Sequence, residues 1–358
     1  MGRKVAIITG ERSGSFYARL LKDALCKRFP SLEVRGTGEG ISPLVEMEDV
    51  AVVGVLSAVA VLPKVWRVFR RLKRAILDWQ PDLLIFVDFP DFNLFLGSAL
   101  RRAGVGFPMI YFIPPTVWAW RHYRINTIRR VCRQVFTLFE FEAEYYRRHG
   151  VDAVWEGHPL VDVLDGEGKE CDSAVIGLLP GSRRKELKNH LPLLLDSAEM
   201  IRSSCGDCKF LVSVVDESYR GMVRERSLPV EVVDSSYELM RSSRLLVGAS
   251  GTVTVEAAIL QRPMVVVYRS SFLDKFIFDH FVRTRFAAMP NIVVGRMVYP
   301  ELLQGEATPE RISSIVLGWL RGGSGINSVM AGIKEFKRYL GPPGVMDRIA
   351  DRIERWLH

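Results

Sequence analysis

Short apolar runs alternate with amphipathic stretches along most of the chain, a pattern typical of buried parallel strands that are each followed by a helix. The predicted strands are 4–9, 83–87, 108–113, 135–138, 153–155, 174–178, 210–214, 230–233, 245–247 and 264–268. Helical periodicity follows most of them, as in 15–29 and 141–149. The sequence therefore predicts an α/β fold with parallel sheets.

A polar stretch without periodicity, residues 162–173, separates two such series of strands and helices and is typical of a linker. The chain has 358 residues, which is enough for two domains because single cores stop growing near about 250–300 residues. We predict an N-terminal domain over 1–163 and a C-terminal domain over 174–340, with a cleft between them.

Residues 64–77 predict a basic amphipathic helix. Its apolar positions recur at helical spacing: Val65, Trp66, Phe69, Leu72 and Ile76. Basic residues fill most of the other positions: Lys64, Arg67, Arg70, Arg71, Lys73 and Arg74. Such a helix suits an anionic membrane surface, although a helix packed on a sheet with a solvated basic face has the same pattern. We predict membrane contact through Val65, Trp66, Phe69, Arg70 and Lys73.

Composition narrows the classes of partner. The formal net charge of +8 fits an anionic partner, such as a nucleic acid, a phosphorylated substrate or an acidic membrane. Nucleic acid is disfavoured, because the basic residues cluster beside aromatic residues on one helix and not along a groove. Five cysteines, an odd number, indicate a reducing compartment, and the Cys205–Cys208 pair lacks two further zinc ligands.

The apolar runs are also too short for a membrane span. The start of the chain has too short an apolar run for a signal peptide. The longest largely apolar stretch, 50–63, has 14 residues, below the roughly 18–20 that cross a bilayer. We therefore expect a soluble or peripheral protein.

Three turns rich in glycine and serine follow predicted strands, where α/β sheets bind ligands. They are 10–14 (GERSG), 180–184 (PGSRR) and 250–252 (SGT). A turn that opens a helix offers N–H groups to a phosphate, and Arg183 with Arg184 suits a diphosphate. Glu256 lies one helical turn beyond Thr252, where its carboxylate can accept hydrogen bonds from two ribose hydroxyls. A capped helix with a solvated Glu256 is the alternative, although the spacing does not fit a capping box.

Several residues at other strand ends are chemical candidates. Asp88 follows strand 83–87 without an evident structural role and is the better chemical candidate, whereas Asp91 is expected to cap the next helix. The tryptophans of loop 114–121 suit either a sugar or lipid site or a core plug. His158 precedes a proline, which favours a loop. Residues 289–296 also resemble a loop, with Pro290 and Gly295 fixing the turn.

Eight segments in order, from Val5 to about Gln304, resemble the lipid-A-disaccharide synthases, which form glycosyltransferase family 19. They are GERSG, VDFPDFN, PTVWAWR, FEFEAEYYRRHGV, GHPL, LLPGSRRKEL, SGTVTVEAAILQRPMVVVYR and MPNIVVGRMVYPELLQ. The resemblance implies a GT-B fold, with two Rossmann-like doubly wound domains facing across a cleft. It further implies that the C-terminal segment 341–358 packs back on the N-terminal domain.

The resemblance also implies the reaction. UDP-2,3-diacylglucosamine and 2,3-diacylglucosamine 1-phosphate (lipid X) would give the β-1,6-linked lipid A disaccharide 1-phosphate and UDP, with inversion. Such a displacement needs a base on the acceptor 6-hydroxyl and stabilisation of the departing diphosphate. No metal or other cofactor is implied. Because both substrates carry acyl chains, the enzyme would work at the cytoplasmic face of the inner membrane of a Gram-negative bacterium.

Residue by residue, the resemblance implies that the C-terminal domain takes the nucleotide and the N-terminal domain the acceptor. The implied catalytic residues are Asp88, Arg183 and Glu11. The implied nucleotide-binding residues are Arg183, Ser250, Gly251, Thr252 and Glu256. The other implied cleft residues are Ser13, Gly14, Asn93, Trp118, His158, Asn291, Arg296 and Gln304.

The sequence departs from the family pattern at two places on the acceptor side. The family's Ser-Gly-Asp is Ser13-Gly14-Ser15 here, which removes a carboxylate near the implied acceptor. The family's Ser-Pro-Ser is replaced in the segment 113–116 (IPPT). Two alternatives therefore stay open: a GT-B transferase with a different acceptor, and a non-catalytic relative that binds a sugar nucleotide or a membrane.

Overall fold

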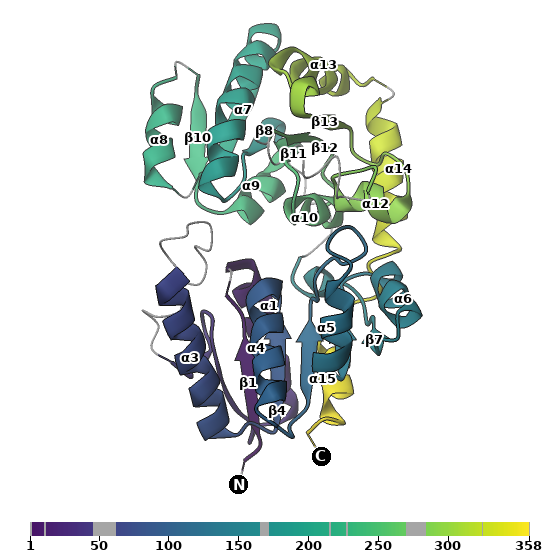
Figure 1. Cartoon of the computed structure of the whole chain (residues 1–358). Helices are drawn as coiled ribbons and strands as arrows, with labels where there is room; N and C mark the ends of the chain where they lie inside the picture. Colours follow the sequence, from purple (N-terminus) through teal and green to yellow (C-terminus); the bar gives the residue numbers. More distant parts are fainter. Residues whose placement is uncertain are drawn as a thin grey trace. The chain divides into compact units, whose positions relative to one another are not determined.

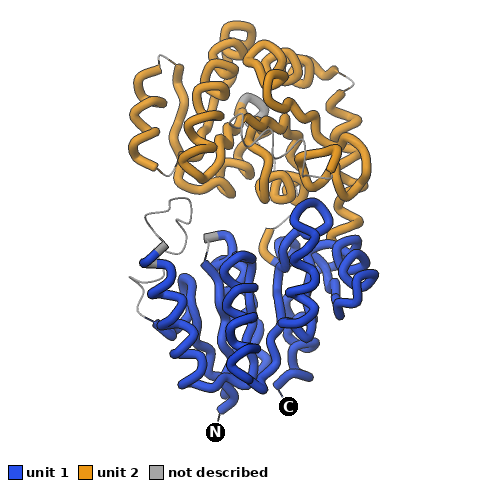
Figure 2. The backbone as a smooth tube through the Cα atoms, viewed as in Figure 1, with its two compact units in different colours: residues 1–162, 341–358 blue, residues 163–340 orange. Residues whose placement is uncertain are grey.

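The computed structural model describes residues 2–10, 12–45, 62–164, 172–214, 216–226, 228–269, 284–323 and 325–357. The chain divides into two compact units (Figure 2). Unit 1 comprises Met1–Asp162 together with Gly341–His358, and unit 2 comprises Val163–Leu340. Each unit contains its own parallel sheet flanked by helices (Figure 1), which confirms the predicted fold class.

Unit 1 is built on a seven-stranded sheet with the order β3-β2-β1-β4-β5-β6-β7, in which all pairs are parallel. Its strands are β1 (Lys4–Ile8), β2 (Glu33–Gly36), β3 (Ser42–Pro43), β4 (Leu83–Val87), β5 (Met109–Phe112), β6 (Gln134–Phe136) and β7 (Ala153–Val154). The strand order reverses between β1 and β4. In open α/β sheets, ligands bind beyond the carboxyl ends of the strands at such a switch point.

Helices cover both faces of this sheet, as doubly wound folds require. They are α1 (Arg12–Arg28), α3 (Leu62–Trp79), α4 (Pro90–Arg102), α5 (Arg124–Val131), α6 (Glu140–Arg148) and α15 (Val345–Glu354), with the short 3-10 helix η3 at Pro159–Asp162. The central strands are fully buried on both faces, so they read as continuous apolar runs in the sequence.

The C-terminal helix α15 belongs to unit 1 and packs against α1 and η3. Its apolar face, which includes Ile349 and Ile353, is buried. The Asp162 carboxylate accepts hydrogen bonds from the backbone N–H groups of Gly344 (2.7 Å) and Met346 (2.9 Å) at the start of the helix.

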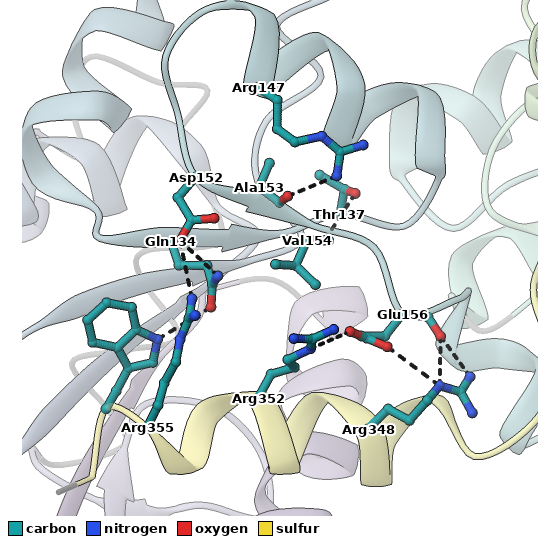
Figure 3. Close-up of polar contacts among 11 residues, drawn as sticks. Gln134, Thr137, Arg147, Asp152, Ala153, Val154, Glu156, Arg348, Arg352 and Arg355 are labelled. Atoms are coloured by element: carbon teal, nitrogen blue, oxygen red, sulfur yellow. Dashed lines mark hydrogen bonds and ion pairs between the residues drawn. The ribbon is translucent and has the colours of Figure 1, made fainter.

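Arginines of α15 also reach back to the strand β7 region (Figure 3). The Arg352 side chain donates to the Glu156 carboxylate at 2.8 Å, and the Arg355 side chain pairs with Asp152 at 3.2 Å. The C-terminal helix is therefore held to unit 1 by ion pairs with residues about 200 positions earlier in the chain.

Unit 2 is built on a six-stranded sheet with the order β10-β9-β8-β11-β12-β13, again wholly parallel. Its strands are β8 (Asp172–Leu179), β9 (Lys209–Ser213), β10 (Val230–Val233), β11 (Ser243–Ala249), β12 (Met264–Tyr268) and β13 (Glu301–Leu303). Its helices are α7 (Arg184–Ser204), α8 (Glu217–Arg224), α9 (Ser236–Ser242), α10 (Val253–Ile259), α12 (Met289–Val294), α13 (Pro309–Leu320) and α14 (Gly325–Lys337), with the 3-10 helix η4 at Gln304–Glu306. The order reverses between β8 and β11, which is the second switch point.

Two local predictions were wrong. Residues 289–294 form helix α12 and not a loop, because Pro290 occupies its first turn and Gly295 (φ 76°) ends it. Asp91 does not cap α4, because that helix begins at Pro90; its carboxylate instead pairs with the side chains of Arg121 and Arg124. Within the described parts of the chain, no helix combines the length and the apolar character that a membrane span requires.

Candidate active site

Asp88 follows β4 at the switch point of unit 1 and begins a strained turn. Asp88 (φ 48°) and Phe89 (φ 52°) are consecutive left-handed residues, a conformation that costs about 1–3 kcal/mol for each non-glycine residue. The carbonyl oxygen of Asp88 accepts hydrogen bonds from Tyr111 Oη at 2.7 Å and Asn93 Nδ2 at 2.7 Å. These bonds hold the strained backbone in place, and such strain concentrates at functional sites.

Glycines of the GERSG turn allow the β1 end to approach this strained turn. A Cβ atom on Gly10 would lie 2.6 Å from the Phe89 ring, and one on Gly14 would lie 3.4 Å from Asp88 Cβ. The first turn therefore lies beside Asp88. Ser13, at the start of α1, is exposed. Glu11, the third implied catalytic residue, lies outside the described residues.

Two implied cleft residues of unit 1 are buried, so the expectation that their side chains line a cleft is corrected. Asn93 is fully buried beneath the Asp88 turn, where its Nδ2 atom donates to the Asp88 carbonyl. His158 packs against Phe139, and its Nδ1 accepts a hydrogen bond from the Leu160 N–H at 3.2 Å. Burial lowers the pKa of His158 to about 3, so the buried ring stays neutral and is too weakly basic to serve as a general base.

The aromatic loop 114–121 is fixed from beneath by a buried carboxyl group. The Trp118 Nε1–H donates to Glu142 Oε1 at 2.9 Å, and Glu142 Oε2 accepts from the N–H groups of Leu138 and Phe139, both at 3.2 Å. Burial raises the pKa of Glu142 to about 7 despite these donors. Glu142 was not among the predicted site residues, although it lies inside the FEFEAEYYRRHGV segment.

The predicted membrane helix α3 packs on unit 1 through part of its apolar face. Phe69 is only 5% exposed and its ring lies 6.0 Å from that of Phe92, so the predicted membrane contact of Phe69 is wrong. Val65 and Lys73 are half-buried, whereas Arg70 is exposed.

Two aromatic rings, one on α3 and one on the neighbouring helix α4, remain outside the core. Trp66 is 51% exposed and Phe95 of α4 is 47% exposed, with ring centroids 6.1 Å apart. Arg67 and Arg70 on the neighbouring positions of α3 are also exposed. We call these four residues, Trp66, Phe95, Arg67 and Arg70, the aromatic-basic patch.

In unit 2, the SGT turn and Glu256 lie together beyond the end of β11. Ser250 Oγ donates to the Ala287 carbonyl at 2.8 Å, whereas Gly251 and Thr252 are exposed. No atom lies within 4 Å of where a Cβ on Gly251 would stand, so the turn is open. Glu256 is half-buried, and burial raises its pKa to about 7.

The PGSRR turn lies across the same switch point, at the end of β8. Glu186 Oε2 accepts from the N–H groups of Ser182 at 3.0 Å and Arg183 at 3.2 Å, so these amides already have an anionic partner. The Arg183 guanidinium lies 3.6 Å from Glu186 and is 72% exposed. Arg184 instead pairs with Asp216, so the expected two-arginine clamp is reduced to Arg183.

His190 links the two strand ends that flank this site, and the sequence analysis missed it. Its Nε2 atom accepts from the Arg269 N–H at 2.9 Å, which leaves Nδ1 to donate to the Pro180 carbonyl at 3.1 Å. Burial lowers its pKa, so the neutral imidazole persists. The ring therefore ties the end of β8 to the end of β12.

The remaining implied residues of unit 2 differ in exposure. Asn291 is fully buried, and its amide bonds to Glu301 Oε1 (2.7 Å) and to three backbone groups of Val298 and Tyr299, each at 2.8 Å. The expectation that it lines a cleft is corrected: it holds the loop before β13. Arg296 is exposed and pairs with Glu335, and Gln304 is half-buried with φ 53°.

The described residues contain no group of three or more His, Cys, Asp or Glu side chains that could hold a metal ion. The Cys205 and Cys208 thiols lie 2.7 Å apart in unit 2 without further ligands among the described residues. The candidate chemistry therefore consists of the Asp88 turn in unit 1 and, in unit 2, Arg183 with the SGT turn and Glu256.

Comparison with known proteins identifies the family. A family model described as lipid-A-disaccharide synthetase matches residues 5–341. The lipid-A-disaccharide synthase of Geobacter sulfurreducens is 34% identical, over 97% of this chain and 95% of the relative. That of Azotobacter vinelandii is 36% identical, over 88% of each chain.

Solved structures are similar in fold alone. MurG of Acinetobacter baumannii superposes with a TM-score of 0.61 at 13% identity, covering 99% of this chain and all of MurG. The UDP-GlcNAc 2-epimerase of Neisseria meningitidis gives 0.66 at 13% identity, covering 98% of this chain and all of the epimerase. With both GT-B units and a family match over nearly its whole length, the chain belongs to the lipid-A-disaccharide synthases, the UDP-sugar-dependent glycosyltransferases of lipid A biosynthesis.

Proposed function

We propose that this protein transfers the 2,3-diacylglucosaminyl group of UDP-2,3-diacylglucosamine to the 6-hydroxyl of 2,3-diacylglucosamine 1-phosphate, with inversion. The products are the β-1,6 disaccharide 1-phosphate and UDP. The observation that carries the proposal is the strained Asp88 turn at the switch point of unit 1, in a chain of this family. Strain of this kind persists where a side chain must be held in one geometry.

Asp88 acts as the general base in this reaction. Its carboxylate takes the proton of the acceptor 6-hydroxyl while that oxygen attacks the anomeric carbon of the donor. The new C–O bond forms on the face opposite UDP as the bond between the anomeric carbon and the diphosphate oxygen breaks. A single displacement of this kind inverts the anomeric centre, and the UDP leaves with the bonding electron pair.

Unit 2 binds the nucleotide. Ionised Glu256 accepts hydrogen bonds from the two ribose hydroxyls, and the open turn Ser250–Thr252 faces the diphosphate. Arg183 supports the charge that develops on the leaving group, because a guanidinium binds phosphate oxygens through two N–H donors. Since Glu186 already occupies the neighbouring amides, Arg183 acts through its exposed guanidinium and not through its backbone.

The protein meets its acylated substrates at the cytoplasmic leaflet of the inner membrane. The aromatic-basic patch supports this proposal, because exposed Trp and Phe rings insert at the lipid interface while arginines attract anionic headgroups. Part of the predicted helix face is used in the core, so Trp66 stays in the proposed contact and Phe95 takes the place of Phe69.

A different acceptor is the second candidate. Ser15 stands where the family has Asp, and it lies in the acceptor unit, with its Oγ 3.1 Å from where a Cβ on Gly38 would stand. A serine in place of aspartate removes a negative charge near the proposed acceptor and leaves unit 2, which is proposed to bind the nucleotide, unchanged. A transferase that accepts a related glycolipid with a different headgroup fits this substitution.

Turnover with defined substrates tests the proposal. Purified protein would be mixed with both acylated sugars in detergent and EDTA, and UDP and disaccharide followed by mass spectrometry, with Asp88→Asn alongside. Disaccharide from the wild type and a loss of about 100-fold or more in the mutant are expected. UDP binding without disaccharide would contradict the assigned acceptor, and Ser15→Asp would then test the second candidate. A loss of activity in EDTA would contradict metal independence.

A further inference from the structure

One backbone oxygen beneath the candidate base receives hydrogen bonds from two buried side chains. Tyr111 Oη, from the end of β5, and Asn93 Nδ2, from α4, both donate to the Asp88 carbonyl at 2.7 Å. Tyr111 and Asn93 are fully buried. Burial holds the pKa of Tyr111 well above its usual range, so the phenol keeps its proton and remains a donor.

The peptide groups on either side of this carbonyl are also hydrogen-bonded. The Asp88 N–H donates to the Phe112 carbonyl at 3.2 Å, and the Asn93 N–H donates to the Phe89 carbonyl at 3.1 Å. Phe89 packs where a Cβ on Gly10 would otherwise stand. A left-handed backbone aims its Cα–Cβ bond differently from a strand, so whatever holds this peptide also sets the direction of the Asp88 carboxylate.

We infer that Tyr111 and Asn93 are positioning residues for the reaction, acting on the Asp88 carboxylate through the Asp88 carbonyl. The inference rests on the proposed function, in which Asp88 is the base. Neither side chain reaches substrate, because both are buried under the turn. Removing either donor lets the left-handed residue relax toward a commoner conformation and moves the carboxylate away from the acceptor hydroxyl.

Tyr111→Phe is the sharpest test, because it removes one hydroxyl and keeps the ring that packs in the core. We expect kcat to fall about 10- to 100-fold, since a displacement of the order of 1 Å costs about that much. The KM values for donor and acceptor should stay within about twofold, because the binding groups are untouched. Asn93→Asp keeps the side-chain volume but replaces the N–H donor with an oxygen that cannot donate to the Asp88 carbonyl. This variant should lower kcat at least as far.

Tyr299→Phe is the matched control. Tyr299 is also fully buried, and its hydroxyl also donates to a backbone carbonyl, that of Arg262 in unit 2, at 3.1 Å. This variant should lose a similar amount of stability, measured by denaturant unfolding, while its kcat stays at the wild-type value. A decrease in kcat equal to that of Tyr111→Phe would overturn the inference, because it would trace the effect to stability alone.

A mutant cycle with Asp88→Glu separates positioning from a general structural effect. Asp88→Glu already misplaces the carboxylate, so adding Tyr111→Phe should cost less than about threefold in kcat. A full additive loss would overturn the positioning role, as would wild-type kcat in Tyr111→Phe beside an inactive Asp88→Asn. An active Asp88→Asn would remove the base and this inference together while disaccharide formation stands. Absence of disaccharide from the wild type would overturn the proposed function and, with it, this inference.

Discussion

At the residue scale, two carboxyl groups share a raised pKa of about 7 for the same cause, burial, but in different surroundings. Glu142 accepts three hydrogen bonds, one of them from the Trp118 indole, and is a support of the aromatic loop. Glu256 receives no side-chain hydrogen bond from the described residues and lies beside the open SGT turn. A half-buried carboxyl group without a partner is the better candidate for binding an external ligand.

The pKa of Glu256 gives a prediction for nucleotide binding. With a pKa near 7, the carboxyl group is mostly neutral below pH 6 and mostly ionised above pH 8. The ionised form accepts hydrogen bonds from both ribose hydroxyls more strongly than the neutral acid, so the Kd for UDP should fall about three- to tenfold from pH 6 to pH 8. Calorimetric titration of UDP at several pH values measures this change.

Glu256→Gln provides the control for that titration. Glutamine keeps the size and does not ionise, so only the pH dependence of UDP itself should remain. The interpretation fails if the mutant shows the same pH dependence as the wild type.

At the element scale, α15 packs on unit 1 through an apolar face and a polar face that contribute unequally to stability. The apolar face is buried against α1 and η3, whereas ion pairs such as Arg28–Asp351 (3.1 Å) lie in solvent. Exposed pairs contribute little, because water and salt screen them and their side chains lose freedom. The stability of the helix should therefore come from its apolar side.

Two single substitutions on α15 compare these faces. Ile349→Ala should lower the free energy of unfolding by about 2–5 kcal/mol, because Ile349 is only 1% exposed and truncation leaves a cavity. Asp351→Ala, two positions along the same helix, should cost less than about 1 kcal/mol. Denaturant unfolding followed by circular dichroism measures both. Equal losses would contradict this, because the exposed ion pair would then contribute as much as the buried face.

The helix α3 presents the aromatic-basic patch beside a face that is already used in the core. Trp66→Ser combined with Phe95→Ser should decrease binding to anionic vesicles by about tenfold or more, because both rings are half-exposed and leave water on insertion. The double variant should unfold at nearly the wild-type denaturant concentration. Co-sedimentation with vesicles measures binding.

A charge variant of the same patch separates insertion from attraction. Arg67→Gln with Arg70→Gln should weaken binding mainly at low salt, since headgroup attraction is screened. Unchanged co-sedimentation of both variants would place membrane contact elsewhere on the protein.

At the scale of the whole molecule, the chain leaves unit 1 at Asp162 and returns to it at Gly341. Unit 2 is therefore a single continuous segment with its own sheet and core, whereas unit 1 needs both ends of the chain. Domains with a core of their own can fold alone.

This arrangement predicts that a fragment of residues 163–340 folds cooperatively and binds UDP with a Kd close to that of the full chain. A fragment of residues 1–162 should fail to fold cooperatively, because it lacks α15 and leaves the apolar faces of α1 and η3 exposed. Circular dichroism and UDP calorimetry on the two fragments test this. Loss of UDP binding by a folded 163–340 fragment would show that unit 1 is needed for nucleotide binding.

The sequence by itself determined the layout of this protein. Periodicity placed strands 83–87 and 264–268 at their observed bounds, because strands buried on both faces are apolar without interruption. Strand 230–233 was also placed at its observed bounds, although it is a half-exposed edge strand that contains Glu231. The carboxyl end of such a strand is visible in the sequence, so Asp88 and the SGT turn are recognisable as candidates from the order of residues alone. The order of eight segments indicated the family, which the family match then confirmed.

Only the tertiary structure decided which polar side chains face solvent and which support the fold. Helical spacing shows that Phe69 and Trp66 share a face, but the neighbouring helix α4 decides that Phe69 is covered. Asn93, His158 and Asn291 are buried, although each bonds to a residue nearby in the sequence, namely Asp88, Leu160 and Glu301. Tyr111 lies 23 residues from the Asp88 carbonyl that it holds. Such contacts depend on strand order, which local sequence does not encode.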